Sequence, residues 1–436
     1  MKFYDNPPRS EWSDICRRPA KSAVELHAVV RGVIEDVRKR GDDAVRDYEQ
    51  RFDKAALSDL AVSADEIKAA EAAVSDELKE AIHLAAANIS RFHEAQRFQP
   101  VRVETCRGIV CEQRSVPIEK VGLYIPGGTA PLFSTVLMLA IPARIAGCSD
   151  IVLCTPPRPD GSCNPAVVYA AHYAGVTRIY KIGGAQAIAA MALGTASVPR
   201  VDKIFGPGNQ YVVAAKQLVS LEDVAIDMPA GPSEVEVIAD STSIPQFVAA
   251  DLLSQAEHGV DSQVVLVSDD RAMVDRVLAA IDEQLPRLPR REIAEAALAN
   301  SKAVLLQSRP EMTAFTNTYA PEHLVIATEQ YDDIASGVTH AGSVFLGPWS
   351  CESAGDYASG TNHTLPTKGY ARAYSGLCLD SFMRKMTLQH LSPAGVESIG
   401  RAVELMAAAE GLDAHKNAMT VRMDYIKQHK TEDNKC

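Results

Sequence analysis

Short apolar segments alternate with helical segments and glycine turns through the middle of this chain. A first series, over residues 120–219, includes KVGLYIPGG, DIVLCTPP and RIYKIGG. A second series, over residues 234–347, includes EVEVIAD, SQVVLVSDD and HLVIAT. Continuous apolar strands that alternate with helices are typical of a parallel sheet covered on both faces. The pattern therefore predicts an α/β fold with two doubly wound sheets, although one larger sheet stays open as an alternative.

Helical patterns flank both series. Residues 22–98 have helical periodicity, and Ser63 and Glu66 have the spacing of a capping box. Helices are expected again from Asp380 onward, in a tail long enough to pack on a second subunit. We therefore predict four parts: an N-terminal helical region (1–115), a first incomplete Rossmann-like domain (116–236), a second one (237–378) and a helical C-terminal tail (379–436).

The composition restricts the possible partners. The net charge of −12, from 44 Lys and Arg against 56 Asp and Glu, argues against nucleic acid or an anionic membrane as a partner. The nine cysteines are scattered and never form C-x-x-C, which is typical of free thiols in a reducing compartment. The N-terminus MKFYDNPPRSEW lacks the apolar core of a signal peptide, and Pro142 and Arg144 interrupt the most apolar run. We expect a soluble, cytoplasmic protein.

Glycine follows three strands of the first series. Such glycines let a ligand approach the end of a parallel strand and the next helix, as in nucleotide-binding α/β sheets. No turn completes a G-x-G-x-x-G motif, so ligand binding and ordinary turns remain about equally open. The positions are Gly127, Gly128, Gly183, Gly184, Gly206 and Gly208.

Polar side chains stand out in the second series. Gln255 and His258 lie three residues apart near a helix end in LLSQAEHG, so they would share one face, either as metal ligands or as caps of the helix carbonyls. Glu322 and His323 are adjacent and cannot both face one atom in regular structure. They suit two roles, water activation by the carboxylate and proton transfer by the imidazole, or else form an ordinary strand-edge pair.

Further candidates lie near the tail. Asp356 belongs to ESAGDYASG, and Glu410 and His415 belong to AEGLDAHKNA. Cys351 could attack an aldehyde, but it lacks a neighbouring base in the sequence, so a buried or idle thiol is the simpler interpretation.

Eight ordered motifs in residues 22–425 resemble the histidinol dehydrogenase family. The resemblance implies a zinc- and NAD-dependent, four-electron oxidation of L-histidinol to L-histidine through bound L-histidinaldehyde, in the last steps of histidine biosynthesis. It also implies one zinc ion per subunit and a homodimer that exchanges its tails and shares its active sites. The motifs are VGLYIPGGTAPLFSTVLMLAIPARIAG, GGAQAIAAMALGT, FGPGNQYV, IDMPAGPSEV, DLLSQAEHG, YAPEHL, GPWSCESAGDYASGTNHTLPT and AEGLDAHKNA.

The resemblance also implies roles for individual residues. His323 would move the protons and Glu322 would activate water. The zinc ligands would be Gln255, His258, Asp356 and, from the partner subunit, His415. NAD would contact Tyr124, Gln186 and Asn209. The substrate would contact Ser233, Gln255, His258, His323, Asp356, Glu410 and His415. Cys351 stands where many family members have proline, which affects only the expected loop geometry.

Two other functions compete with this one. A related zinc and NAD dehydrogenase could act on another small polyol, such as sulfopropanediol, but such relatives diverge at the APEHL and EGLDAHKNA motifs that this chain keeps. A non-catalytic metabolite-binding protein could share the fold, because fold alone does not give function. Retention of all the implied ligands and of both proton-transfer residues favours the enzyme.

Overall fold

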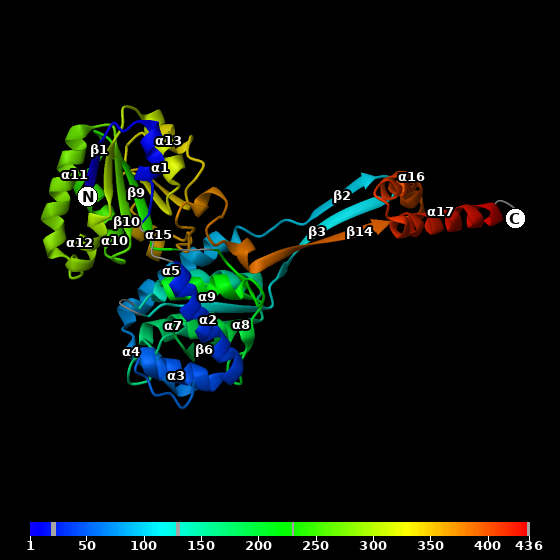
Figure 1. Cartoon of the computed structure of the whole chain (residues 1–436), viewed down its shortest axis with the longest axis horizontal. Coiled ribbons are helices and arrows are strands. Elements are labelled where there is room, and N and C mark those ends of the chain that lie inside the picture. The colour runs from blue at the N-terminus through cyan, green and yellow to red at the C-terminus, as the bar shows by residue number, and fades with distance from the viewer. Residues whose placement is uncertain (19–22, 128–130, 229–230, 434–436) are drawn as a thin grey trace. The chain divides into compact units, whose positions relative to one another are not determined.

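The computed structural model describes residues 1–18, 23–127, 131–228 and 231–433, so Gly128 and Cys436 lie outside the described residues. The chain forms two compact units (Figure 1). The larger unit comprises Met1–Gln96 and Ile118–Phe382, and the smaller comprises Arg97–Pro117 and Met383–Cys436. Both predicted sheets belong to the larger unit.

The first sheet has five parallel strands in the order β6-β5-β4-β7-β8. The strands are β4 (Lys120–Tyr124), β5 (Asp150–Thr155), β6 (Arg178–Lys181), β7 (Lys203–Phe205) and β8 (Ala225–Ile226). Helix α6 packs on α7 and α8 packs on α9, so two helix pairs cover the sheet as predicted. These helices are α6 (Phe133–Ala146), α7 (Pro165–Ala174), α8 (Gly184–Leu193) and α9 (Gln210–Val219).

The second sheet has six parallel strands in the order β1-β11-β10-β9-β12-β13. Val235 and Val237 of β9 belong to one hydrophobic core, and Ile238 belongs to the core on the other face, as alternating strand side chains require. The strands are β1 (Lys2–Asp5), β9 (Glu234–Ala239), β10 (Gln263–Ser268), β11 (Lys302–Leu305), β12 (His323–Ile326) and β13 (Ser343–Leu346). The prediction of two doubly wound, Rossmann-like sheets is confirmed.

Helices lie on both faces of this sheet (Figure 1). One layer consists of α10 (Pro245–Ala256), α11 (Arg271–Gln284), α12 (Arg291–Ala299) and the short η2 (Leu285–Arg287). The other consists of η1 (Arg9–Glu11), α1 (Trp12–Ile15), α13 (Arg309–Tyr319) and α14 (Asp332–Ala335). Helix α15 (Glu352–Tyr357) follows β13 and contacts α10.

We expected the N-terminal region to be helical, but it also contains a strand. Strand β1 pairs in parallel with β11, placing Lys2 opposite Lys302, although hundreds of residues separate them. A local pattern cannot reveal so distant a partner. The rest of the region has the expected helices, α2 (Ala23–Arg40), α3 (Asp42–Phe52), α4 (Ala64–Ala73) and α5 (Asp76–Glu94). They pack on the helices of the first sheet, and the Ser63–Glu66 capping box is confirmed.

The smaller unit combines an antiparallel sheet with two helices. Strand β3 (Ile109–Pro117) pairs with both β2 (Val101–Cys106) and β14 (Met383–Leu391). Helix α16 (Pro393–Ala409) packs on α17 (Asp413–Asp433). Helices dominate from Asp380 onward as expected, but the sequence did not reveal β14, which gains its hydrogen bonds from a strand far away in the sequence. Two short helices, η3 (Tyr370–Arg372) and η4 (Leu379–Phe382), complete the larger unit.

Two further observations bear on the sequence analysis. Within the described ranges, no helix combines the length and apolar character needed to cross a membrane. The eight cysteines in the described part of the chain are all free thiols, in agreement with the expectation for them.

Candidate active site

Glu322 and His323 lie where β12 begins beside the amino end of β9. The main chain of Glu234, the first residue of β9, contacts both side chains. Its N–H donates to Oε2 of Glu322 at 2.8 Å, and its carbonyl oxygen lies 3.2 Å from Nδ1 of His323. Only a protonated Nδ1 can donate to a carbonyl, so Nε2 is left with its lone pair in neutral imidazole. The pair is buried, with 6% of Glu322 and 4% of His323 exposed.

Helix α15 supplies two carboxyl groups to the same imidazole. Glu352 and Asp356 lie four residues apart and therefore share a helix face. Oε1 of Glu352 lies 3.8 Å from Nδ1 of His323, and Oδ1 of Asp356 lies 3.6 Å from its Nε2. These separations are ion pairs rather than hydrogen bonds. Potential ligand atoms of His323, Glu352 and Asp356 all lie within 4.8 Å of one another, so the three could hold a metal ion.

Gln255 faces this cluster from the last turn of α10. The side chain is fully buried, and its amide nitrogen donates to Oε1 of Glu352 while its oxygen accepts from the N–H of Glu234 at 3.2 Å. It therefore points into the cluster instead of capping its own helix. His258 lies three residues after Gln255, beyond the end of the helix, and is exposed.

Neighbouring groups nevertheless shift the pKa of His258. Desolvation lowers its pKa, and the carboxylate of Asp356 partly opposes the shift. The structure thus brings Gln255 and Asp356 into contact with the His323 cluster, with His258 near Asp356.

The carboxyl groups around His323 keep its imidazole protonated at neutral pH. Burial would lower the pKa of His323, but Glu352, Glu322 and Asp356 outweigh it and raise the value to about 10. Burial raises the pKa of Glu322 to about 8 and that of Glu352 well above its ordinary range. For Asp356, burial is outweighed by the interaction with His323, which lowers the pKa. A single imidazolium faces three carboxyl groups, which is an environment that favours an added cation.

Two buried atoms in the cluster lack a hydrogen bond. Nε2 of His323 and Oδ1 of Asp356 face each other, and neither has a hydrogen-bond partner among the described residues. Buried polar groups in folded proteins are normally satisfied. These two atoms are therefore available to a metal ion, a water molecule or a substrate.

The three residues expected at NAD lie at the carboxyl end of the first sheet. The hydroxyl of Tyr124 accepts from the N–H of Gly184 at 3.0 Å. Gln186 is buried and donates to Oε1 of Glu49 at 2.8 Å. Asn209 is exposed and caps α9 by accepting from the N–H groups of its first turn. Each side chain has a partner within the protein, so their contact with NAD stays a prediction.

The glycine after β7 brings two strand ends close together. A Cβ atom on Gly206 would lie 2.2 Å from the carbonyl oxygen of Tyr124, and the φ of Gly206 is +121°. The side chains of Asp227 and Lys216 bond the N–H and the carbonyl oxygen of Gly206, each at 2.8 Å. Strands β4 and β7 are neighbours on either side of the point where strand order reverses, which is the usual ligand position in such sheets.

The remaining predicted residues contribute less to this cluster. Ser233 precedes Glu234, and its carbonyl oxygen accepts from the N–H of Gln263 at 3.2 Å. Glu410 ends α16 and His415 lies in the first turn of α17, so both belong to the smaller unit, where both are exposed. Their roles stay predictions. Cys351 is the residue before α15 and makes no capping hydrogen bond with its side chain.

Sequence reasoning missed two members of the cluster. Glu352 could have been found from its spacing of four residues to Asp356. Glu234 acts mainly through its peptide, which leaves no signal in the side-chain pattern. Glu322 and His323 also lie at the amino end of β12, whereas general rules for α/β sheets point to the carboxyl ends.

The fold and the cluster together define an α/β enzyme with an imidazole and carboxylate centre able to hold a metal ion. A sequence model of the histidinol dehydrogenase family matches residues 16–423, and the chain belongs to this family. It is therefore an oxidoreductase.

Individual relatives agree over nearly the whole chain. Histidinol dehydrogenase of Bacteroides thetaiotaomicron is 60% identical over 427 residues, covering 98% of this chain and 100% of the relative. The Shigella sonnei protein of the same name is 54% identical over 414 residues, covering 94% of each. The crystal structure of histidinol dehydrogenase from Elizabethkingia anophelis has a TM-score of 0.96 and 54% identity, covering 98% and 99%. These relatives do not favour the alternative of a dehydrogenase for another polyol.

Proposed function

We propose that this chain oxidises L-histidinol to L-histidine through bound L-histidinaldehyde, with two successive hydride transfers to NAD. The main support from the structure is the buried Nε2 of His323, which has no hydrogen-bond partner among the described residues. The Glu234 carbonyl oxygen keeps a proton on Nδ1, so Nε2 is the nitrogen that accepts the substrate proton once the imidazolium has released its own. Removal of a proton from an alcohol requires such a base beside the carbinol oxygen.

The residues present suit a zinc ion. We propose that Gln255, His258, Asp356 and His415 of the partner subunit hold one zinc ion per subunit. The unpartnered Oδ1 of Asp356 and the buried Gln255 amide support this set, which has nitrogen and oxygen donors and no thiolate. A bound zinc ion would act as a Lewis acid that binds the substrate nitrogens and so orients the carbinol carbon for hydride transfer.

In the first oxidation, His323 takes the hydroxyl proton while the carbinol hydride leaves for NAD. Asp356, 3.6 Å from Nε2, stabilises the imidazolium that results. Since the ring is almost completely buried, water cannot compete readily for this proton.

In the second oxidation, Glu322 activates the water that adds to the aldehyde. A general base must be ionised, and burial raises the pKa of Glu322 to about 8, which opposes ionisation. His323 opposes this effect of burial, because its charged ring lies 3.7 Å from Oε2 of Glu322. His323 must release the proton of the first oxidation to solvent before the second one. After the hydrate forms, it removes a proton from the hydrate while the second hydride leaves for NAD.

We further propose that NAD binds the first domain (116–236), where Tyr124, Gln186 and Asn209 lie at the carboxyl ends of the strands. Metal and substrate would use the second domain (237–378), including Ser233 just before it. The tail (379–436) would bring Glu410 and His415 to the site of a partner subunit in a homodimer. The free thiols support a reducing compartment, the cytoplasm.

The activity is tested by NADH formation with L-histidinol, and with a sulfonated propanediol as the competing substrate. We expect oxidation of L-histidinol with two NADH formed for each histidine, in line with the two transfers. The His323→Asn variant should be inactive. Release of one NADH with free aldehyde as the final product would contradict the proposed two-step reaction.

The metal is tested by chelation. We expect loss of activity with retention of most secondary structure in circular dichroism, because the proposed ligands lie at helix ends and loops around large apolar cores. Restoration by zinc completes the test. Full activity in a verified metal-free sample would exclude the catalytic role of zinc.

A further inference from the structure

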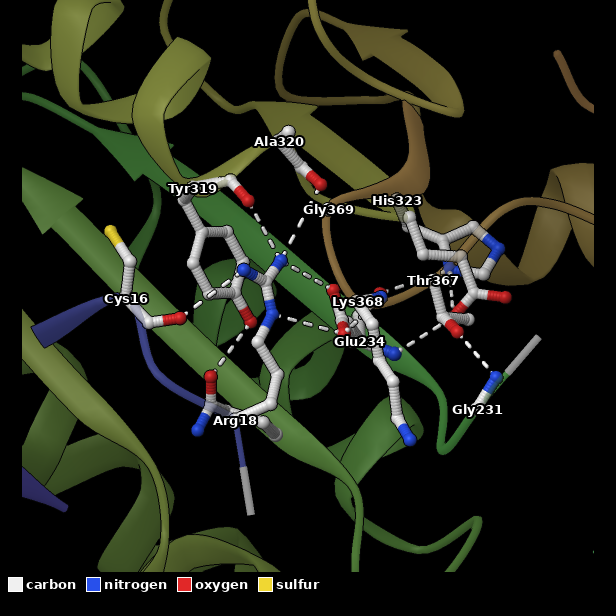
Figure 2. Close-up of polar contacts among 12 residues, drawn as sticks. Cys16, Arg18, Gly231, Glu234, Tyr319, Ala320, His323, Thr367, Lys368 and Gly369 are labelled. Carbon is white, nitrogen blue, oxygen red and sulfur yellow. Dashed lines mark hydrogen bonds and ion pairs between the residues drawn. The ribbon is translucent and has the colours of Figure 1, made fainter. Parts of the chain in front are cut away.

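Arg18 links the start of β9, which contacts the Glu322 and His323 side chains, to the segment that carries both residues. Its guanidinium bonds both carboxylate oxygens of Glu234, with Nε 3.1 Å from Oε1 and Nη2 2.8 Å from Oε2. The same Nη2 also donates to the carbonyl oxygen of Tyr319 at 2.8 Å. Glu234 opens β9, and Tyr319 ends α13 just before the loop that leads to β12. Figure 2 shows Arg18 between these groups.

The environment of Arg18 restricts its movement. The guanidinium lies over the Tyr319 ring, 3.8 Å from its centroid, and Nη1 donates to the carbonyl oxygen of Cys16 at 3.2 Å (Figure 2). Only 13% of the Arg18 side chain and 2% of the Glu234 side chain is exposed. The N–H of Lys368 donates to Oε1 of Glu234 at 2.7 Å. Bidentate contacts of this kind fix orientation as well as position.

Glu234, which Arg18 holds in place, is also the residue whose main-chain groups contact Glu322 and His323. The Glu234 N–H bonds Glu322, and its carbonyl oxygen holds Nδ1 of His323. A shift of the Glu234 main chain would displace both side chains at once and would weaken the contact that keeps the Nδ1 proton of His323 in place. The side-chain contacts of Glu234 therefore control the geometry of two groups that they do not touch.

We propose that Arg18 is a positioning residue for the reaction, acting through Glu234 on Glu322 and His323. This proposal takes its reaction from the proposed function. The contacts of Arg18 and Glu234 from which we argue are independent of that function. If Arg18 had no positioning role, its ion pair with the buried Glu234 would contribute only to the stability of the fold.

The chain offers a matched control at the opposite end of the same strand. Arg309 bonds the carboxylate of Asp240 at 3.0 Å, directly after β9, and Asp240 is 4% exposed. Arg309→Met therefore removes a comparable ion pair without touching the Glu234 peptide. Arg18→Met and Arg309→Met should lower the melting temperature to a similar extent.

The two variants should differ in kinetics. We expect Arg18→Met to lower kcat by about 10- to 100-fold for both L-histidinol and L-histidinaldehyde, since His323 acts in both steps and small misplacement of a catalytic group is costly. KM should change little, because the substrate contacts remain. Arg309→Met should keep the kcat of the wild type. Arg18→Lys, which keeps the charge but loses the fork, should fall between the two.

Chemical rescue provides a second readout. A pocket of about 380 Å³ is lined by Arg18, Ser13, Thr318 and Arg372, so a small cation can reach the vacated position in Arg18→Ala. We expect guanidinium ions at low concentration to raise the kcat of Arg18→Ala and to leave Arg309→Ala unchanged. A role in stability alone would not produce this difference.

Hydrogen exchange separates the proposal from the proposed function. In Arg18→Met, the Glu234 amide should exchange faster than in the wild type, whereas in Arg309→Met it should not. Faster exchange of the Glu234 amide in Arg18→Met, together with a wild-type chain that fails to oxidise L-histidinol, would keep the positioning role and reject the proposed reaction. Unchanged exchange, or equal losses of kcat in the Arg18 and Arg309 variants, would overturn the positioning role. If Arg18→Met does not fold, wild-type kcat in Arg18→Lys would overturn it as well.

Discussion

Glu236 offers a quantitative test of the electrostatics around β9. Its side chain is fully buried, Oε1 accepts from the Thr316 hydroxyl, and Oε2 has no partner among the described residues. Burial raises its pKa from 4.5 to about 8, and Thr316 and Arg18 offset only part of the effect. The group is therefore neutral in the folded chain at neutral pH.

The sign of the pH dependence follows from this shift. Below pH 4.5, the folded and unfolded chains both carry the proton. Between 4.5 and 8 the unfolded chain releases it and the folded chain keeps it, so the free energy of unfolding falls as the pH rises. From pH 5 to pH 7.5, the contribution of Glu236 falls by about 3 kcal/mol.

Glu236→Gln removes this titration. The amide leaves a buried N–H group without a partner, at a cost of about 1–3 kcal/mol that is the same at both pH values. The difference in unfolding free energy between variant and wild type should therefore shift by about 3 kcal/mol in favour of the variant from pH 5 to pH 7.5. Other buried carboxyl groups titrate in both chains and cancel.

The assay is urea unfolding followed by circular dichroism at the two pH values and constant ionic strength. Glu329→Gln, at an exposed position, controls for the loss of one carboxylate. If the difference between Glu236→Gln and wild type is equal at pH 5 and pH 7.5, then Glu236 does not hold its proton in the folded chain, and the argument from burial is wrong.

Three further predictions concern the site and the assembly. Glu322→Gln should impair oxidation of histidinaldehyde more than that of histidinol, because only the second step consumes water, whereas His323→Asn should impair both; equal losses in the Glu322 variant would contradict the assignment. Gly206→Ala should weaken NAD binding by about 5- to 150-fold, the effect of about 1–3 kcal/mol of strain, because its φ is +121° and its Cβ would clash with a carbonyl of β4. Gly32→Ala, in α2 with open space around it, is the matched control and should retain NAD affinity in fluorescence titration. Exchange of subunits between His415→Ala and His323→Ala chains should restore about a quarter of wild-type activity if the sites are shared, and confirmed exchange without recovery would mean that His415 serves its own chain.

The sequence predicted the parts of the fold that depend on local pattern. Apolar strands and helices with regular spacing gave both parallel sheets, and the short-range Ser63–Glu66 spacing gave a helix start that the structure contains. Strands β1 and β14 were missed because their partners lie far away in the chain. A short strand acquires its hydrogen bonds from its neighbour, and its own residues carry little information about that neighbour.

The site shows the same division. Gln255, Asp356, Glu322 and His323 were proposed from motifs, and the structure brings their side chains into one cluster. The contribution of Arg18 was invisible, because its partner Glu234 lies 216 residues further along the chain. Contacts made by a peptide group, such as those of Glu234, have no side-chain signature at all.

The pairing of β1 with β11 also sets the order in which the second sheet can form during synthesis. Lys2–Asp5 leaves the ribosome first, but its partner, Lys302–Leu305, follows about 300 residues later. At typical rates of translation this interval lasts roughly 15 to 60 seconds. During that time the first strand has no partner in this sheet, and Arg18 has Glu234 within reach only after most of the interval has passed. Strand β12 with His323 emerges later still, so the cluster around His323 is assembled among the last features of the second sheet.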